Sequence, residues 1–130
     1  SDMRKVILIL LVGLLLCNTS FAGVDGLFAG ELKYPNGDSY KMVSEFNTND
    51  EGAVWGKYTW IEKDTKYKGS FFKGKLEDFD LKIFWTDKFG EGWLKIQFDE
   101  KFESFDGEWG AIKNNKEKKK EGNWTGERLY

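Results

Sequence analysis

The chain has 130 residues, enough for one domain and too few for two of ordinary size. Its formal net charge of −2 gives no general attraction for nucleic acid, so we expect no nucleic-acid partner. With no histidine and a single cysteine, Cys17, the chain lacks the groups for Ser–His or Cys–His catalysis and for a zinc site, and we expect no metal or other cofactor.

Residues 1–22 have the features of a secretory signal peptide. A basic pair, Arg4 and Lys5, precedes an apolar run over residues 6–17, and the small residue Ala22 offers a cleavage position. The apolar run predicts a hydrophobic leader helix, and we take the first two residues to be a cloning remnant. We therefore expect an exported protein, located in the periplasm or outside a bacterial cell.

Two other fates of this segment are open. A retained membrane anchor would need about 20 apolar residues, more than the run over residues 6–17 supplies. Lipid attachment at Cys17 is disfavoured because Leu16 stands where that modification requires a small residue. In each case we expect residues 23–130 to form a single β domain.

Residues 23–130 alternate between apolar and polar side chains with the two-residue period of β-strands. The clearest run places on one face the side chains of Phe79, Leu81, Ile83 and Trp85. Aromatic residues make up 17% of the chain, a composition that favours strands. The pattern predicts about eight strands, near residues 26–34, 38–46, 53–61, 66–73, 77–85, 91–99, 104–112 and 122–130.

Turn-forming residues separate the predicted strands. Asn36–Gly37 is typical of a type I′ hairpin turn, and the stretch Lys73–Lys75 also predicts a turn. Such short connections indicate an antiparallel up-and-down meander. We expect a closed barrel or a strongly curved sheet, because eight strands enclose just enough space for side chains or one small ligand. Two packed layers, or an open sheet covered by another element, are the alternatives.

Three predicted strands repeat a unit in which glycine separates two large side chains on one face, namely Tyr67-Gly69-Phe71, Phe105-Gly107-Trp109 and Trp124-Gly126-Arg128. A ring from the neighbouring strand can lie across the gap that each glycine leaves, and the missing Cβ allows the strand to coil. The unit therefore indicates a curved sheet with its rings gathered on the concave side.

The C-terminal half resembles a group of small exported bacterial proteins. The shared pattern is F-x-G-x-W-G followed by G-x-W-x-G-x-R, carried here by Phe105, Gly107, Trp109, Gly110, Gly122, Trp124, Gly126 and Arg128. This resemblance covers residues 56–128 and implies a β-rich exported protein, with no particular chemistry. Residues 32–40 and 56–75 also resemble MORN repeats, which implies an open β-sheet scaffold for protein or membrane contacts.

The inward-facing rings are the candidate ligand-binding residues. We expect a tapered pocket with a wall of aromatic side chains, formed by Tyr58, Trp60, Phe71, Trp85, Trp109 and Trp124. Arg128 shares a face with Trp124, and two roles are open for it. Its guanidinium could stack on a tryptophan and plug one barrel mouth, or it could bind an anion inside the pocket.

Four aromatic residues fall out of phase with this inward face, namely Trp55, Phe72, Phe84 and Trp93. If their strands are adjacent, these rings form an exposed apolar patch, which monomeric proteins rarely keep without a function. The alternative is that β-bulges shift the register and return the rings to the core.

Charged residues supply two further candidates. The stretch Lys113–Glu121 is expected to be a mobile, solvated hairpin, with peripheral contact to anionic lipid as the alternative. A hydrolase pair could come from carboxylates that lie mostly at turns or solvated positions, namely Glu77, Asp78, Asp80, Asp106 and Glu108.

These patterns favour a non-catalytic exported protein that binds a small apolar or aromatic-stacking ligand. The first alternative is a scaffold that contacts a protein or a membrane through an open sheet, and the second is a carboxylate-dependent hydrolase. The expected partner is accordingly a small molecule or a protein, and the sequence leaves the oligomeric state open.

Overall fold

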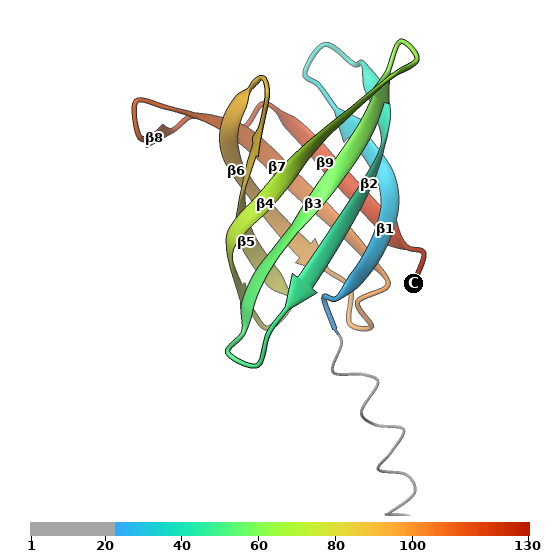
Figure 1. Ribbon diagram of the computed structural model, residues 1–130, viewed down its shortest axis with the longest axis vertical. Helices are drawn as coiled ribbons and strands as arrows, with labels where there is room; N and C mark the ends of the chain where they lie inside the picture. The colour runs from blue at the N-terminus through green and yellow to red at the C-terminus, as the bar shows by residue number, and fades with distance from the viewer. Residues whose placement is uncertain (1–22) are drawn as a thin grey trace, which may run out of the picture.

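The computed structural model describes residues 23–130 (Figure 1), and the predicted signal peptide with its leader helix lies outside the described residues. All regular structure in the described part is β-strand, and no helix there is long and apolar enough to cross a membrane. The strands are β1 (Gly26–Lys33), β2 (Ser39–Thr48), β3 (Ala53–Glu62), β4 (Thr65–Glu77), β5 (Asp80–Asp87), β6 (Gly90–Phe98), β7 (Ser104–Lys113), β8 (Lys116–Glu117) and β9 (Gly122–Arg128).

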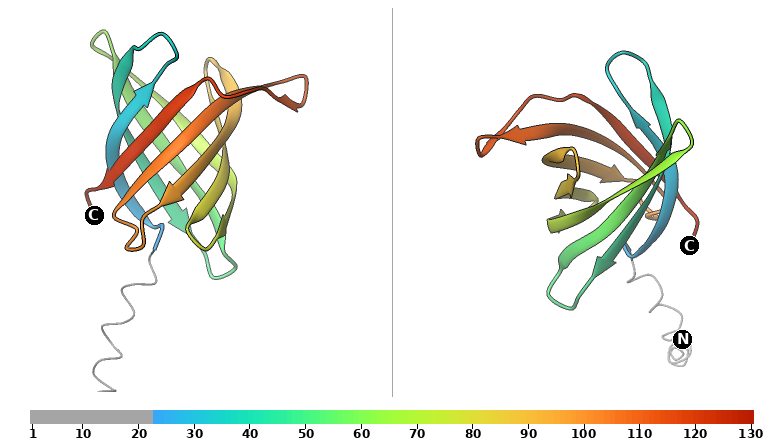
Figure 2. Two further views of the ribbon diagram at one scale, coloured as in Figure 1. Left: turned by 180° about the vertical axis from the view of Figure 1, so that it is seen from behind. Right: turned by 45° about the horizontal axis from the view of Figure 1, so that its top comes forward.

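The sheet closes into an eight-stranded antiparallel barrel, as predicted. Its strand order is β6-β5-β4-β3-β2-β1-β9-β7, and the additional pairing of β6 with β7 completes the circle. The two-residue strand β8 pairs only with β7 and forms a hairpin that projects from the wall (Figure 2). Closure gives every long strand two neighbours and so removes exposed sheet edges. The open-sheet and two-layer alternatives are therefore wrong for this chain.

Strand β4 is longer than expected because a β-bulge, and not a turn, occupies the predicted turn Lys73–Lys75. The register moves from the pair Gly56–Phe71 to the pair Val54–Gly74, which leaves one extra residue in β4. Lys73 lies within the bulge and has a left-handed backbone conformation, with a φ of 54°. The strand then continues to Glu77, so the real connection to β5 lies at the next two residues.

Two connections have the type I′ geometry, but neither is the predicted one. Lys63 and Asp64 both have positive φ between β3 and β4, and Asn114 and Asn115 do so between β7 and β8. The Asn36–Gly37 prediction is wrong, because of these two residues only the glycine has positive φ. Its N–H donates to the Tyr34 carbonyl at 3.0 Å, which makes a type I turn followed by a left-handed glycine.

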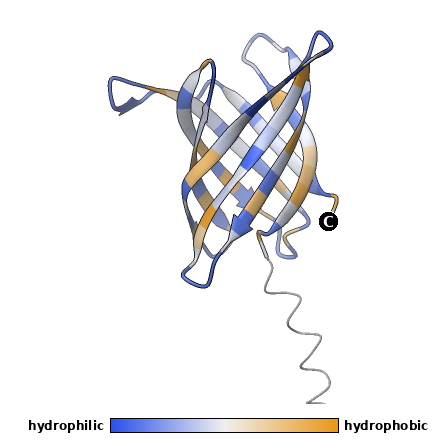
Figure 3. Cartoon of the chain, in the orientation of Figure 1, coloured by the Kyte–Doolittle hydropathy of each residue, from blue (hydrophilic) through white to orange (hydrophobic). Residues whose placement is uncertain are grey.

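Aromatic rings fill the barrel interior near the end where the β2–β3, β4–β5 and β6–β7 connections lie. Phe28 contacts Phe46 and Phe105 with ring centroids 5.9 and 5.4 Å apart, and Phe98 contacts Phe105 at 5.5 Å. Figure 3 shows hydrophobic and hydrophilic residues interspersed along the strands. Because successive side chains of a strand point to opposite faces, this pattern places one set of residues inside the barrel. Phe79 is an exception to the predicted inward run, since it lies in the β4–β5 turn and is exposed.

Two of the three glycines of the repeated unit, Gly69 and Gly126, lie beneath a ring from the neighbouring strand, as predicted. A Cβ at Gly69 would overlap the Tyr58 ring, and one at Gly126 would lie 2.7 Å from Cζ of Phe105. Gly107 is packed more loosely, against Ile96 and backbone carbonyls. At Gly69 and Gly126, therefore, the absence of a side chain makes room for a ring inside the barrel.

Arg128 plugs one end of the barrel, called the closed end below, where the β2–β3, β4–β5 and β6–β7 connections lie. Its guanidinium donates to the carbonyls of Phe102 and Asp25, at 2.9 and 2.6 Å, and to that of Gly23. The guanidinium carbon lies 4.7 Å from the centroid of the Phe28 ring. The plug thus stacks on a phenylalanine, and not on a tryptophan as expected.

Candidate functional site

An aromatic cavity occupies the other end of the barrel, called the mouth below, where the β1–β2, β3–β4, β5–β6 and β7–β9 connections meet. Its volume of about 500 Å³ lies within the range of small-molecule sites. The lining residues are Leu32, Tyr34, Met42, Tyr58, Trp60, Glu62, Tyr67, Trp85, Asp87, Phe89, Trp109, Ala111, Lys113, Glu121 and Trp124. Phe89 is 66% exposed and Lys113 is exposed, so the cavity opens to solvent at the mouth.

Strands β3 and β4 supply one wall of stacked rings. Trp60 lies between Tyr58, 5.7 Å away with a 23° interplanar angle, and Tyr67, 5.2 Å away with a 26° angle. The first pair is adjacent on the inward face of one strand, and the second is a cross-strand pair in the register. Phe89 extends this wall at the rim, with its centroid 5.3 Å from that of Tyr67.

Tryptophans from β5, β7 and β9 form the rest of the wall and the floor. Trp85 and Trp109 pack edge to face at 6.0 Å, and Tyr34 packs edge to face against Trp109 at 5.3 Å. Trp124 meets the Tyr58 ring at 5.0 Å and an angle of 77°. Such edge contacts hold the rings in fixed orientations, so the cavity is largely preformed.

The indole N–H of Trp60 has no hydrogen-bond partner within the protein, although the residue is only 4% exposed. The indole N–H groups of the other tryptophans that line the cavity all have hydrogen-bond acceptors. Trp85 donates to the carbonyl of Trp93 at 3.2 Å, Trp109 to that of Lys33 at 3.3 Å, and Trp124 to Ser44 Oγ at 2.9 Å. A buried donor without an acceptor costs free energy, and this N–H is itself enclosed by protein atoms.

Tyr58 connects the floor of the cavity to its rim. Its hydroxyl donates to Asp87 Oδ2 at 2.7 Å, and Asp87 Oδ1 in turn accepts from the Phe89 N–H at 2.8 Å. Burial, followed by the hydrogen bond to Asp87, raises the pKa of Tyr58 far above its ordinary value. Tyr58 therefore stays protonated at physiological pH and fixes the Asp87 carboxylate at the mouth.

The rim is mainly acidic, with Glu62, Asp87 and Glu121 facing one lining lysine, Lys113. These carboxylates act on Tyr34, whose pKa is raised by burial first, then by Glu62, and further by Asp87 and Glu121. Their field therefore reaches into the aromatic part of the cavity.

Most of the predicted ligand-binding residues line this one cavity, namely Tyr58, Trp60, Trp85, Trp109 and Trp124. Phe71 does not, because it packs deeper, with its ring 5.0 Å from that of Phe46. Arg128 lies at the closed end, where it is occupied by carbonyl groups, so the anion-binding alternative inside the pocket has no support from its position.

Sequence reasoning missed the polar rim. Glu62, Asp87 and Lys113 are the last residues of β3, β5 and β7. Each follows by two residues an inward side chain of the same strand, namely Trp60, Trp85 and Ala111 respectively. Their inward phase was visible in the sequence, and in an up-and-down meander these strand ends fall at the same end of the barrel. Glu121, by contrast, is placed only by the course of the β8 hairpin.

The predicted surface patch forms as a row across four adjacent strands on the outer wall. Phe72 pairs with Phe84, Phe84 pairs with Trp93, and Trp55 lies opposite the β4 bulge. The bulge does not return these rings to the core. Trp55 is 42% exposed, and Phe72 and Phe84 contact each other at 6.0 Å while half-buried.

Trp93 departs from the expected exposure, since it is only 6% exposed. It faces outward, but its ring lies over Gly110, and its indole N–H donates to the Lys118 carbonyl at 2.7 Å. The stretch Lys113–Glu121, called the arm below, thus covers this ring. Glu117 of the arm also forms a salt bridge with Lys82 at 2.7 Å. The arm is solvated as predicted, and these contacts join it to the barrel.

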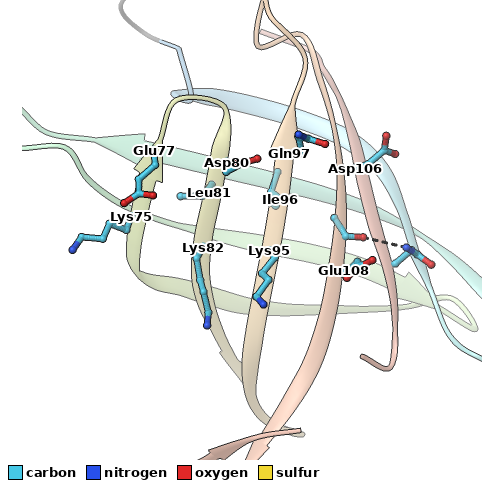
Figure 4. A pocket seen from close by; sticks show the side chains of 12 residues that line it. Lys75, Glu77, Asp80, Leu81, Lys82, Lys95, Ile96, Gln97, Asp106 and Glu108 are labelled. Carbon is cyan, nitrogen blue, oxygen red and sulfur yellow. Dashed lines mark hydrogen bonds between the residues drawn. The ribbon is translucent and has the colours of Figure 1, made fainter. Parts of the chain in front are cut away.

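The candidate hydrolase carboxylates lie on the outer wall, and all five are exposed. Four of them, Glu77, Asp80, Asp106 and Glu108, line a shallow hollow of about 630 Å³. Figure 4 shows Lys75, Lys82 and Lys95 among the lining residues, one on each of three neighbouring strands. Side chains of both signs on an open wall provide no enclosed cleft in which two carboxyl groups could flank a glycosidic bond.

Within residues 23–130, no group of acidic, histidine or cysteine side chains has the arrangement of a metal site. Comparison with protein-family models, with curated proteins and with solved structures gives no match. The geometry of the mouth and of the outer wall is therefore the basis for assigning a function to this chain.

Proposed function

We propose that this chain is a non-catalytic binding protein, exported by its leader, that holds a small ligand against the aromatic rings of the barrel mouth. The observation that carries the proposal is the preformed cavity of about 500 Å³, whose walls are stacked and edge-packed aromatic rings. Such a cavity favours a ligand that presents a flat or apolar body to the rings.

The contrast between the two barrel ends supports this choice. At the closed end, the rings of Phe28, Phe46 and Phe105 fill the interior and Arg128 covers them. At the mouth, the rings line a space of about 500 Å³, which would hold a ligand of drug-like size or smaller. The free energy of burying an apolar ligand is about 25 cal/mol per Å² removed from water.

Dye binding tests the proposal. N-phenyl-1-naphthylamine, an uncharged aromatic dye, is expected to bind with increased fluorescence, and Phe89→Ala is expected to weaken binding about three- to tenfold by removing the rim ring. The matched control is Phe79→Ala, which removes an exposed ring at the closed end. Equal loss in both variants, or no dye binding to the wild-type protein, would contradict the proposal. Native mass spectrometry of protein taken from its own envelope would then identify the natural ligand.

Protein contact through the outer wall is the second candidate. The observation that favours it is the row of Trp55, Phe72 and Phe84, which leaves a 42% exposed tryptophan beside two partly exposed rings. Trp55→Ser should reduce co-purification of a partner or self-association in analytical ultracentrifugation. An unchanged profile would count against this candidate and leave the mouth as the site.

A further inference from the structure

The charge at the mouth specifies the kind of ligand. Resting on the function proposed above, we propose that the cavity selects small organic ammonium ions, with the cationic head between the carboxylate rim and the rings. The class is that of a quaternary or tertiary amine with a small apolar body.

The first support is the excess of negative charge. Glu62, Asp87 and Glu121 line the cavity together with Lys113. In the turns at the mouth, Lys63 and Lys88 are matched by Asp38 and Asp64, so the excess of carboxylates among the lining residues remains. Bringing a cation to this rim relieves repulsion among the carboxylates, whereas an anionic ligand would add to it.

The second support is that ring faces at the rim already carry a cation. The Lys88 ammonium lies 5.6 Å from the Tyr67 centroid and 5.5 Å from that of Phe89. These distances are typical of cation–π contacts, in which a positive charge is attracted to the face of an aromatic ring. The chain's own ammonium group therefore demonstrates the interaction that a ligand head would make further inside, where Trp85, Trp109 and Tyr34 are less hydrated.

The third support concerns polar matching inside the cavity. Asp87 is held in place by the Tyr58 hydroxyl, so one carboxylate is preorganised. A ligand with a cationic head is matched by this fixed carboxylate, while a simple hydrocarbon leaves it without a partner from the ligand.

A pair of isosteric probes separates charge from shape. Choline and 3,3-dimethylbutan-1-ol share their shape and hydroxyl oxygen and differ in a positive nitrogen against a neutral carbon. We expect isothermal titration calorimetry at low salt to give choline about tenfold tighter binding, the size of a cation–π contribution joined to carboxylate attraction. The double variant Glu62→Gln/Glu121→Gln keeps the Asp87–Tyr58 bond and should weaken choline about fivefold.

The control variant is Asp50→Asn/Glu100→Gln, which makes the same change in net charge at exposed turns of the closed end. Choline affinity should be unchanged there. Equal affinity for the two probes, or a preference for the alcohol, overturns the cation inference and leaves the proposed binding function standing. Binding of neither probe also overturns it, and the dye experiment then decides the binding function separately. Equal loss in the rim and control variants overturns the assignment of the cation to this rim.

Discussion

Trp93 and Trp55 provide a matched pair of substitutions on the outer wall. Both are outward-facing tryptophans within strands, Trp55 as the third residue of β3 and Trp93 as the fourth of β6, so changing each to serine alters strand propensity alike. They differ in environment, because Trp93 is 6% exposed beneath the arm and Trp55 is 42% exposed. Only Trp93 donates its indole N–H to an arm carbonyl, that of Lys118 at 2.7 Å.

The expected difference in stability follows from these contacts. A tryptophan side chain has about 200 Å² to bury, and the two exposures differ by roughly a third, which gives about 2 kcal/mol at 25 cal/mol per Å². The hydrogen bond to Lys118 adds about 1 kcal/mol. We therefore expect Trp93→Ser to lower the free energy of unfolding by about 3 kcal/mol more than Trp55→Ser does. The difference between variants is a sounder quantity than either absolute loss.

Urea unfolding followed by far-UV circular dichroism measures this difference without depending on tryptophan fluorescence. With a slope of about 2 kcal/mol per M, the urea midpoint of Trp93→Ser should lie about 1.5 M below that of Trp55→Ser. Limited proteolysis should also cut the arm faster in Trp93→Ser, since its anchor is gone. Equal midpoints with equal proteolysis would refute the conclusion that the arm covers Trp93.

Three further predictions concern the barrel interior. Gly69→Ala should lower the free energy of unfolding by about 2–3 kcal/mol, because the new Cβ would overlap the Tyr58 ring. Ser70→Ala, on the outer face, should change it little. Equal urea midpoints for the two variants would contradict this packing. Because the pKa of Tyr58 is raised in the folded state, only the unfolded phenol ionises near pH 10, so the free energy of unfolding falls as pH rises above 10. Tyr58→Phe should therefore reduce the slope of this fall by about 1.4 kcal/mol per pH unit. An unchanged slope would count against the raised pKa. Arg128→Lys should lower the calorimetric melting temperature by about 5–10 °C, because one ammonium cannot replace three carbonyl contacts and the stack on Phe28. An unchanged melting temperature would show that Arg128 contributes no stability.

The strand pattern was predictable because it depends on a local rule. A two-residue alternation with turn residues between runs fixes which side chains share a face, and the glycine units fix where rings can cross. The rings of Tyr58 and Phe105 over Gly69 and Gly126 are two instances of this rule, although the sequence did not indicate which ring would cover which glycine. Closure followed from the number of strands, since a one-sided meander must hide its dry face.

Features set by long-range contact were not predictable in the same way. The β4 bulge resembles a turn in the sequence, because a lysine–glycine–lysine stretch suits both, and only the neighbouring strands decide between them. Trp93 looked exposed because its phase is outward. Its cover comes from the arm, about 25 residues further along the chain, and the sequence of the arm is polar throughout.

The inward charges explain why the barrel opens at one end only. On β3 the inward side chains run from Tyr58 through Trp60 to Glu62, and on β5 they run from Trp85 to Asp87. A carboxylate at an inward position is tolerated only where water or a positive group can reach it, because burying an unpaired charge is costly. At the closed end backbone carbonyls satisfy Arg128, and the Asp25 carboxylate accepts from the Thr48 hydroxyl at 3.1 Å. The same physical requirement thus seals one end with an arginine and keeps the other end accessible to a cation.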